Sequence, residues 1–404
     1  MTQGLGHHIA RSAAPAWNEV VEERAPRERA STGEAQALRV LYLMRGTTVP
    51  ASRFRVQQFL PYLRRRGMEV VVRAAYGDAY NRVAASAVGP AYKLWCSLRR
   101  LPQMMDADRF DVVVIQKPTL PFSAWPETVA RWRNPRLVFD VDDAVYTGGE
   151  GWMEGRRRQV FEAICHQAAH VICGNGRLAE AVGQAAPTTV IPTVVDARRY
   201  RPALRGRSGS TVRIGWMGTS ANFQSLAMIA GVLRELARRP QVEVELVSNA
   251  LFEPLSGVEG VVQKRWSAGR EVVDLQGFDI GVMPLVDTAV TRGKCGFKAI
   301  QYMAVGVPVV ASPVGVNPAV VGQEKGRRGG WMARDVDAFE AALGRLVADG
   351  DLRRRLGAQG RQRVEAKYSM EAVIDGYVEV LKEVARRRWR PPPGGRASMG
   401  RERQ

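Results

Sequence analysis

Residues 293–312 read GKCGFKAIQYMAVGVPVVAS, and this stretch decides more about the fold than any other part of the chain. Apolar residues recur at helical spacing over residues 294–304, which predicts an amphipathic helix. Residues 307–311, VPVVA, then predict a short strand buried in a parallel sheet. Gly306 stands where a C-terminal helix cap is expected. A helix that leads directly into a buried strand is typical of an α/β fold.

The predicted helix carries two lysines and a glutamine on one side. Lys294, Lys298 and Gln301 lie at positions i, i+4 and i+7, which share a helix face. Two ammonium groups and a carboxamide near the first turns of a helix suit an anion that also carries hydroxyl groups. A sugar nucleotide is such a ligand, because it combines a diphosphate with a ribose. The alternative is an ordinary amphipathic helix whose lysines are only solvated.

The same stretch resembles the donor-binding helix and the following strand of family 4 glycosyltransferases of GT-B fold. Lys298, Gln301, residues 302–304, Gly306 and residues 308–310 match the pattern of that family. The resemblance extends over about residues 38–390, and this block is its most specific part. It implies a sugar-nucleotide-dependent transferase that retains the anomeric configuration.

Two positions of this block depart from the family. Gln301 stands where the family usually has a Glu bound to the donor ribose, and an earlier family Glu would fall near Gly293. A glutamine still donates and accepts hydrogen bonds with hydroxyl groups, although it lacks the stronger charge-assisted bond. We therefore expect Gln301 to contact the ribose, and Gln301→Glu to keep or improve donor binding.

The resemblance also implies the architecture, which is α/β. It predicts two Rossmann-like domains that face each other across a cleft, with a C-terminal helix that crosses back to the first domain. Along the chain, residues 53–67 predict an amphipathic helix between two buried strands. The predicted segments are a disordered tail at 1–36, an N-terminal acceptor-side domain at 37–196, a linker at 197–211, a C-terminal donor-binding domain at 212–370, a crossover helix at 371–390 and a disordered tail at 391–404.

Composition restricts the class of protein. A length of 404 residues suits two domains, and the chain has no run of eighteen apolar residues that would predict a membrane span. The first 36 residues do not have the pattern of a secretory signal. The four cysteines form no C-x-x-C pair. We therefore expect a cytoplasmic protein with reduced thiols.

The net charge of +19 has three explanations, namely nucleic acid binding, attraction to an anionic membrane, and the arginine bias of a GC-rich genome. The chain has no pattern typical of nucleic-acid-binding domains, so we expect no nucleic acid partner. Peripheral contact with the anionic inner face of the plasma membrane stays open. Residues 92–105, YKLWCSLRRLPQMM, are apolar and basic at helical spacing. They predict either a helix packed on the sheet or a helix at a membrane surface.

One cluster has the spacing of a metal site. In CHQAAHVIC, residues 165–173, His166 and His170 are i, i+4 on a predicted helix. Gln167 replaces the glutamate of the H-E-x-x-H zinc motif, and the segment runs on into an apolar strand. We interpret these residues as packing residues and expect no metal here.

The donor should bind at the carboxyl ends of the strands in the second domain. Gly218, Thr219, Ser220 and Asn222 form the first loop there, where backbone amides can approach a phosphate. The resemblance implies a second close approach at Gly315. Because this loop contains no basic residue, Lys294 and Lys298 must supply more of the charge that neutralises the diphosphate.

Acceptor chemistry is predicted for the first domain. Asp140, Asp142 and Asp143 follow a buried strand, and Asp142 or Asp143 is the candidate to orient or deprotonate a sugar hydroxyl. The alternative is that one of them caps a helix. Other predicted acceptor-side residues are Arg53 and Arg55, from a Ser-Arg-x-Arg segment found in the family, and Lys117 at the end of another strand.

These observations favour a glycosyltransferase that moves a sugar from a nucleotide-sugar donor to a saccharide, lipid-linked or small-molecule acceptor, as in polysaccharide biosynthesis. We expect no cofactor and no metal requirement, because basic side chains and backbone amides can stabilise the leaving diphosphate. Two alternatives are a sugar-nucleotide epimerase of the same fold and a non-catalytic GT-B partner subunit. The first needs carboxylates and histidines in the cleft, and the loss of both family glutamates keeps the second open.

Overall fold

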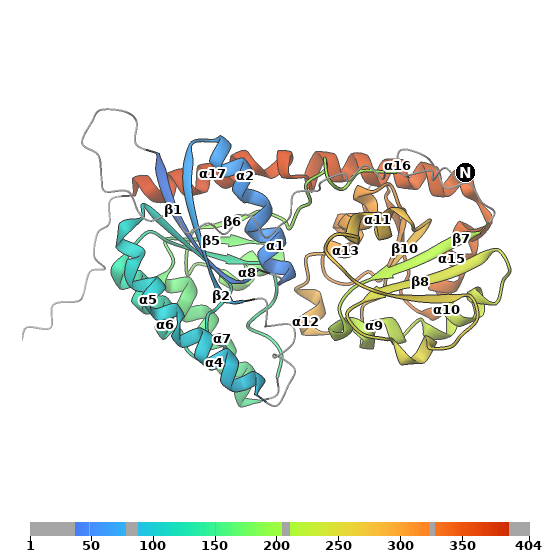
Figure 1. Cartoon of the computed structure of the whole chain (residues 1–404), viewed down its shortest axis with the longest axis horizontal. Coiled ribbons are helices and arrows are strands. Elements are labelled where there is room, and N and C mark those ends of the chain that lie inside the picture. The colour runs from blue at the N-terminus through green and yellow to red at the C-terminus, as the bar shows by residue number, and fades with distance from the viewer. Residues whose placement is uncertain are drawn as a thin grey trace, which may run out of the picture. The chain divides into compact units, whose positions relative to one another are not determined.

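The computed structural model describes residues 37–47, 49–77, 88–149, 151–203, 211–322 and 328–387. The two predicted tails and the Gly/Ser-rich part of the predicted linker, 204–210, lie outside these residues. Strands alternate with helices, and the strands form two parallel six-stranded sheets, as the sequence predicts (Figure 1). The strands are β1 (Leu38–Gly46), β2 (Met68–Tyr76), β3 (Val112–Gln116), β4 (Leu137–Val141), β5 (His170–Cys173), β6 (Thr188–Val190), β7 (Val212–Met217), β8 (Val242–Ser248), β9 (Val261–Arg265), β10 (Ile280–Met283), β11 (Val309–Ala311) and β12 (Gly330–Met332).

Helices flank both sheets, and short 3₁₀ turns lie at Gln57–Phe59, Asp106–Arg109, Ser220–Asn222 and Glu253–Leu255. The α-helices are α1 (Pro50–Arg55), α2 (Leu60–Arg65), α4 (Gly89–Leu98), α5 (Arg100–Met105), α6 (Trp125–Arg133), α7 (Trp152–Gln167), α8 (Gly176–Val182), α9 (Phe223–Ala227), α10 (Ala230–Ala237), α11 (Glu271–Gln276), α12 (Ala289–Arg292), α13 (Phe297–Ala304), α14 (Asn317–Val321), α15 (Val336–Ala348), α16 (Gly350–Lys367) and α17 (Met370–Arg386).

The described residues divide into two compact units. The N-terminal unit contains residues 37–46, 59–192 and 373–387, and the C-terminal unit contains residues 47–58 and 193–372, apart from the residues outside the description. Helix α17 is last in the sequence, yet from Val373 onward it belongs to the N-terminal unit. The chain therefore crosses back to its first unit at the end.

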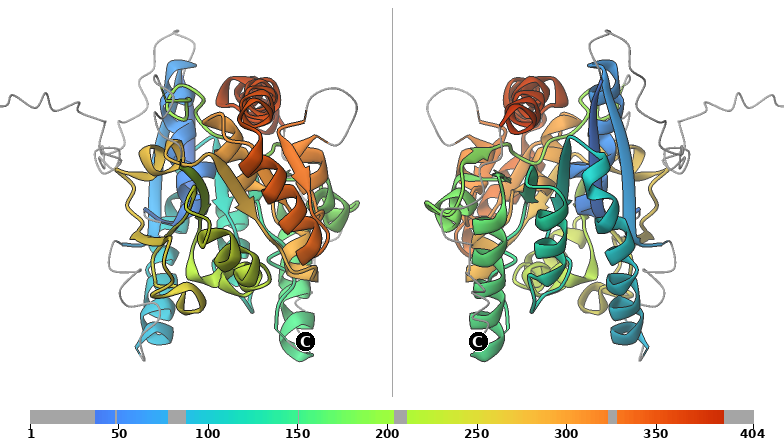
Figure 2. Two further views of the ribbon diagram at one scale, coloured as in Figure 1. Left: turned by 90° about the vertical axis from the view of Figure 1, so that its right-hand side faces the viewer. Right: turned by 90° about the vertical axis from the view of Figure 1, so that its left-hand side faces the viewer.

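The N-terminal unit is built on a sheet of strand order β2-β1-β3-β4-β5-β6. Because parallel crossovers are right-handed, this order places α4 to α8 on one face and α2 on the other. Helices α5 and α6 cover a core that includes Leu41 and Val113. On the opposite face, the Tyr377 hydroxyl of α17 lies 3.2 Å from the Tyr42 hydroxyl of β1. Helices α4 to α7 lie next to one another in one layer (Figure 2).

The C-terminal unit has the strand order β12-β11-β10-β7-β8-β9. One face of this sheet packs against α10 and α15, and the other packs against α13. Strands β10 and β11 lie fully inside the unit, with every residue buried, which agrees with the predicted buried strand of the VPVVA segment. Because β7, β10 and β11 are neighbours, their carboxyl ends and the loops that follow them meet at one edge of the sheet.

Residues 47 and 49–58 group with the C-terminal unit, whereas the sequence predicts that they belong to the N-terminal domain. Phe54 of α1 explains the difference, because its ring lies 4.2 Å from the ring of Phe297 and 6.3 Å from that of Tyr200. Both partners belong to the C-terminal unit. Tertiary packing therefore overrides the neighbourhood of this segment in the sequence.

The single helix predicted over residues 53–67 is also wrong in detail. It divides into α1, a 3₁₀ turn and α2, with a break at Val56, whose φ and ψ are −123° and −67°. Gln58 stabilises the break by donating hydrogen bonds to the carbonyl oxygens of Phe54 (2.6 Å) and Val194 (2.7 Å). Pro61, in the first turn of α2, has no amide hydrogen to continue a helix from residue 57.

Candidate functional site

Lys298 lies directly over the loop that follows β7. The Lys298 Nζ atom is 5.8 Å from the centre of a Trp216 ring. A Cβ atom built at Gly218 would lie 2.6 Å from the Lys298 Cε atom and 2.8 Å from the Trp216 ring. Glycine at position 218 thus lets the lysine side chain cross close to the backbone at the carboxyl end of β7.

Lys294 reaches the same loop by another route than the sequence predicts. The predicted helix over 294–304 begins only at Phe297, because Gly296 has φ +65°, a left-handed conformation that interrupts the chain between α12 and α13. Lys294 therefore does not share a helix face with Lys298. Its Nζ atom lies 2.5 Å from the Asn222 Oδ1 atom. The structure thus brings Gly218, Asn222 and both lysines together, as predicted, although the helical register that motivated the prediction is incorrect.

The end of α13 agrees with the predicted cap. Gly306 has φ +78°, and its amide donates to the Met303 carbonyl (3.0 Å), while the Val307 amide donates to the Tyr302 carbonyl (3.0 Å). These two bonds are those of a Schellman motif. The Tyr302 hydroxyl accepts a bond from the Met217 amide (3.0 Å), so α13 is fixed against the end of β7.

Gln301 is held by a buried carboxylate that the sequence analysis missed. The Gln301 Nε2 atom donates to Glu271 Oε1 at 3.0 Å, and both side chains are buried. Glu271 also accepts bonds from Arg53 Nη2 (2.8 Å), Trp266 Nε1 (3.2 Å) and the Tyr200 hydroxyl. Burial, together with Glu271, raises the pKa of Tyr200 well above its usual value, so its hydroxyl keeps its proton. The bond to Glu271 uses one of the two Nε2 hydrogens and fixes the orientation of the Gln301 carboxamide.

This network corrects the prediction for Arg53 and Arg55. Both were expected on the acceptor side, but both are buried, with exposed fractions of 4% and 0%, within the C-terminal unit. Arg53 pairs with Glu271, and its guanidinium lies 5.1 Å from the Trp266 ring. A buried cation needs such a partner, so Arg53 is a structural element of the Gln301 support.

The remaining donor-loop predictions fall at the same edge of the sheet. Thr219 accepts a bond from the Asn222 Nδ2 atom at 3.1 Å, and the Ser220 amide donates to Asn249 Oδ1 at 2.8 Å. Gly315 has φ +58°, and a Cβ atom there would lie 2.6 Å from the Arg292 carbonyl oxygen. Packing against Arg292 therefore accounts for this glycine, and its contact with a donor stays a prediction.

In the N-terminal unit, Lys117, Asp142 and Asp143 form one ion-pair cluster. The Lys117 Nζ atom lies 3.0 Å from Asp142 Oδ1 and also pairs with Asp143. Burial would lower the pKa of Lys117, but the two carboxylates outweigh it and raise the pKa. Lys117 has φ +64°, which is rare for a residue with a side chain, and its amide donates to the Asp140 carbonyl (3.0 Å).

This cluster answers the question of helix capping. Helix α7 follows β4 but begins at Trp152, after Gly151, so neither Asp142 nor Asp143 caps it. Asp142 is nearly buried, whereas the Asp143 side chain is 51% exposed. Asp143 is therefore the more solvent-accessible carboxylate of the pair. Asp140 is buried beneath them.

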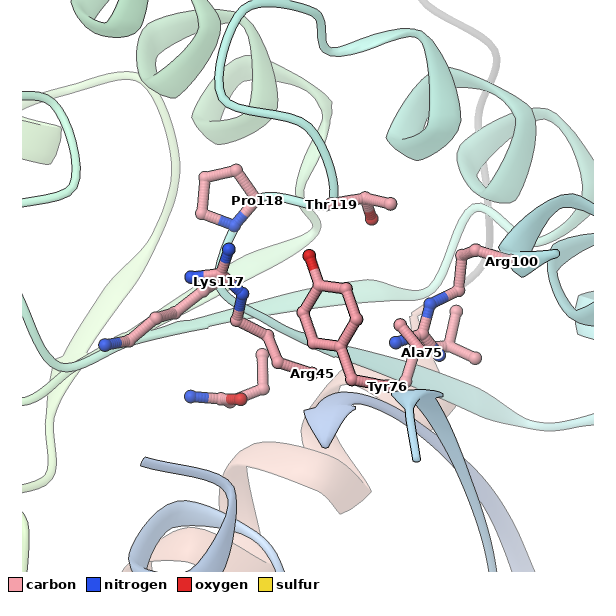
Figure 3. Close-up of a pocket in the computed structure, with 9 residues that line it drawn as sticks. Arg45, Ala75, Tyr76, Arg100, Lys117, Pro118 and Thr119 are labelled. Carbon is pink, nitrogen blue, oxygen red and sulfur yellow. The ribbon is translucent and has the colours of Figure 1, made fainter. Parts of the chain in front are cut away.

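A small, shallow hollow lies beside this cluster at the carboxyl ends of β1, β2 and β3 (Figure 3). Tyr76 stands between Arg45 and Arg100, with its hydroxyl directed toward Thr119. Lys117 also lines the hollow. Arg100 is buried and donates to the carbonyl oxygens of Arg73 (2.8 Å) and Met44, and burial lowers its pKa to about 10.

Sequence reasoning missed Glu271, Arg45, Tyr76 and Arg100. Arg45 and Tyr76 lie at the ends of β1 and β2, so the strand-end rule used for Lys117 could have found them. Glu271 has no such signal, because it opens a helix and meets Gln301 only in the folded unit.

His166 and His170 have the spacing of a zinc pair in the sequence, but in the structure they lie on different elements. Helix α7 ends at Gln167, and His170 is the first residue of β5, where its Nε2 atom lies 2.9 Å from the Thr189 hydroxyl. Burial lowers the pKa of His170. Over the described ranges, no three His, Cys, Asp or Glu side chains gather as metal ligands. Within the same ranges, no helix has both the length and the apolar content to cross a membrane.

Comparisons with known proteins find a similar family, similar relatives and a similar fold. Residues 213–349 match the family model for glycosyl transferases group 1. This part of the chain is therefore similar to that family. The match includes the β7 loop, Glu271, both lysines, Gln301 and Gly315.

Two curated relatives are similar over about half of the chain. One is an MMP alpha-(1->4)-mannosyltransferase of Mycolicibacterium hassiacum, 37% identical over 211 residues, which are 49% of this chain and 49% of the relative. The other is a GDP-mannose-dependent monoacylated alpha-(1-6)-phosphatidylinositol monomannoside mannosyltransferase of Corynebacterium glutamicum, 27% identical over 48% of this chain and 56% of the relative. The chain thus matches about half the length of these relatives.

Among solved structures, Anabaena HepE in complex with UDP and glucose is similar with a TM-score of 0.62. The similarity covers 86% of this chain and 100% of HepE at 14% identity, which shows the fold. The chain has the GT-B glycosyltransferase fold, as the sequence analysis expected.

Proposed function

We propose that the protein is a glycosyltransferase that binds a nucleotide-sugar donor in the C-terminal unit and transfers the sugar with retention of configuration. The observation that carries this proposal is the position of Lys298 over Gly218, with Gln301 on the next turn of the same helix. Phosphate groups of a donor at this edge would meet the ammonium group of Lys298 and the backbone of the β7 loop. The Gln301 carbonyl oxygen would accept a hydrogen bond from a ribose hydroxyl.

Leaving-group stabilisation follows from the same residues. When the bond between the sugar and the diphosphate breaks, negative charge develops on the diphosphate. Lys294 and Lys298 supply positive charge at fixed positions, because Asn222 holds one (2.5 Å) and the Trp216 ring lies under the other (5.8 Å). Such fixed charge stabilises the transition state without a metal ion, so we propose that transfer needs none.

The acceptor would bind to the N-terminal unit. Asp143 is exposed at the carboxyl end of β4, next to the hollow lined by Arg45, Tyr76 and Lys117. Its carboxylate can accept a hydrogen bond from an acceptor hydroxyl, orient the hydroxyl oxygen and receive its proton. Lys117 holds this carboxylate in place through the ion pair.

We propose that the acceptor is a saccharide or is lipid-linked. We also propose that the protein is cytoplasmic and makes peripheral contact with an anionic membrane.

The epimerase alternative is not favoured, because the relatives named above are mannosyltransferases. The non-catalytic alternative predicts that Asp143 has no role in turnover. The GDP-mannose dependence of the second relative makes GDP-mannose the first donor to test here.

The test has two stages. First, thermal unfolding is measured with a panel of nucleotide sugars, where a donor at one hundred times its dissociation constant should stabilise the protein by about 2.7 kcal/mol. Second, the donor that stabilises is supplied with candidate acceptors, and the product is analysed for anomeric configuration. If no nucleotide sugar shifts the unfolding temperature, the donor site is wrong. If a donor binds and no acceptor is glycosylated, the result favours the non-catalytic alternative.

A further inference from the structure

Among the described residues, the N-terminal unit exposes four tryptophans, whereas in the C-terminal unit Trp216 is buried and Trp266 and Trp331 are partly buried. Trp95, Trp125, Trp132 and Trp152 are 53%, 54%, 74% and 74% exposed. All four belong to the layer of helices α4 to α7 on one face of the sheet (Figures 1 and 2). Large aromatic side chains normally bury most of their surface, so four of them in one layer require an explanation.

Helix α4 is the clearest part of this layer. Leu94, Trp95 and Leu98 fall at i, i+1 and i+4, which places them on one helix side, and each is more than half exposed. On α6, Trp125 and Trp132 are separated by seven residues and therefore share a side as well. We call the six residues Leu94, Trp95, Leu98, Trp125, Trp132 and Trp152 the tryptophan face.

Arginines are interleaved with the tryptophan face. The Arg99 guanidinium lies 4.7 Å from the Trp95 ring, and that of Arg133 lies 5.7 Å from the Trp132 ring. Arg133 pairs with Asp108, and Arg158 pairs with Glu162. Arg156 donates to the Phe122 carbonyl oxygen (2.9 Å) and to Gln159 Oε1 (3.3 Å), which are both neutral groups. The ion pairs of the described residues do not include Arg99, Arg131 or Arg156. The layer therefore presents apolar side chains together with uncompensated positive charge.

We propose that the tryptophan face docks the N-terminal unit onto an anionic lipid surface. Tryptophan is favoured at the boundary between water and hydrocarbon, because its ring is apolar and its N–H needs a polar partner. Leu94 and Leu98 would enter the acyl boundary beside Trp95, as in an interfacial amphipathic helix. The arginines would meet anionic headgroups, and the net charge of +19 adds attraction at longer range. This inference gives the peripheral contact proposed above a defined surface, and it does not depend on sugar transfer.

The experiment measures sedimentation of the full chain with vesicles of phosphatidylcholine, with and without phosphatidylglycerol. We expect the protein to sediment with the anionic vesicles and to be released by salt, because the charge term is screened. The triple variant Leu94→Ala/Trp95→Ala/Leu98→Ala should reduce the partition coefficient by at least about tenfold, because three apolar side chains no longer leave water. Trp132→Ser, at a 74% exposed position, should weaken binding with little risk to folding.

The matched control is Leu251→Ala/Val273→Ala, which removes two aliphatic side chains of the C-terminal unit that are 62% and 58% exposed. It should bind vesicles like the unchanged protein. Equal binding to neutral and anionic vesicles, or unchanged binding of both tryptophan-face variants, would overturn the proposal. If the protein is a dimer in light scattering and the triple variant is a monomer, the face joins two copies instead. If a donor shifts the unfolding temperature but the protein does not bind vesicles, the membrane contact is rejected and the proposed sugar transfer is unaffected.

Discussion

Each of the two units contains its own parallel six-stranded sheet. The units differ in the side chains at the carboxyl edge of the sheet and in the exposure of the helices that cover it. In the N-terminal unit, the strand-end lysine, Lys117, is bound by two carboxylates, and the helix layer exposes four tryptophans. In the C-terminal unit, Lys298 lies over a glycine and a tryptophan ring, and Trp216 is buried. The same fold thus offers a positioned carboxylate in one unit and positioned lysines in the other. Side chains at strand ends, not the strand order, decide what each unit can bind.

The largest effect is expected when the lysine of the C-terminal unit is removed. Lys298→Ala should weaken donor binding by about 1.5 to 3 kcal/mol, because a charge-assisted contact with the diphosphate is lost. Calorimetry with the donor found by thermal shift measures this change. The matched control is Lys367→Ala, an exposed lysine at the end of α16 in the same unit, which should bind the donor normally. Equal affinities of the two variants would remove Lys298 from the donor site.

The counterpart in the N-terminal unit is Asp143→Asn, which should act on transfer and not on donor affinity. We expect the rate to fall by at least about tenfold, because an amide cannot take the proton of the acceptor hydroxyl. Since Asp143 is half exposed, its ion pair with Lys117 contributes little to stability, and the melting temperature should change little.

Asp142→Asn provides the contrast. This carboxylate is nearly buried, so losing its ion pair with Lys117 should lower the stability by about 1 to 3 kcal/mol. Rates are compared well below both melting temperatures. Normal transfer by the Asp143 variant would make the whole cluster structural.

Gln301→Glu tests how the C-terminal unit holds its ribose-binding residue. From the sequence, this change should keep or improve donor binding. The bond from Gln301 Nε2 to Glu271 (3.0 Å) adds a second expectation, which concerns the stability of the folded protein. A second carboxylate beside Glu271 removes a donor and adds repulsion, so stability should fall by about 1 to 3 kcal/mol. The reciprocal variant Gln301→Glu/Glu271→Gln should recover part of the loss in thermal unfolding. A single variant as stable as the original protein would contradict the network.

The smallest effect is expected from metal removal. Transfer in excess chelator should proceed at the rate measured without chelator, because Lys294 and Lys298 carry the charge of the leaving group. Activity is measured with and without added magnesium or manganese. A complete loss that either ion restores would assign a metal role to the carboxylates that follow β4.

The features that could be predicted from the sequence are those that depend on contacts between residues close together in the chain. The buried strand after α13, the cap at Gly306 and the glycine loop after β7 were predictable, since each follows from periodicity or turn chemistry within a few residues. The prediction that Lys294 shares a helix face with Lys298 was wrong because one glycine, Gly296, interrupts the helix. The prediction for Arg53 was wrong because its partner, Glu271, is 218 residues away in the sequence.

By itself, the sequence determined that the chain folds into two α/β units and which strand ends carry lysines and carboxylates. Alternating apolar segments are encoded locally, and the direction of a parallel strand fixes which of its ends meets a ligand. Only the tertiary structure decided that Gln301 is supported by Glu271, that α1 belongs to the C-terminal unit and that the tryptophans of α4, α6 and α7 stay uncovered. Each of these three features depends on which distant segments pack together. A hydrophobic pattern predicts that a segment is buried, but it does not predict which segment packs against it.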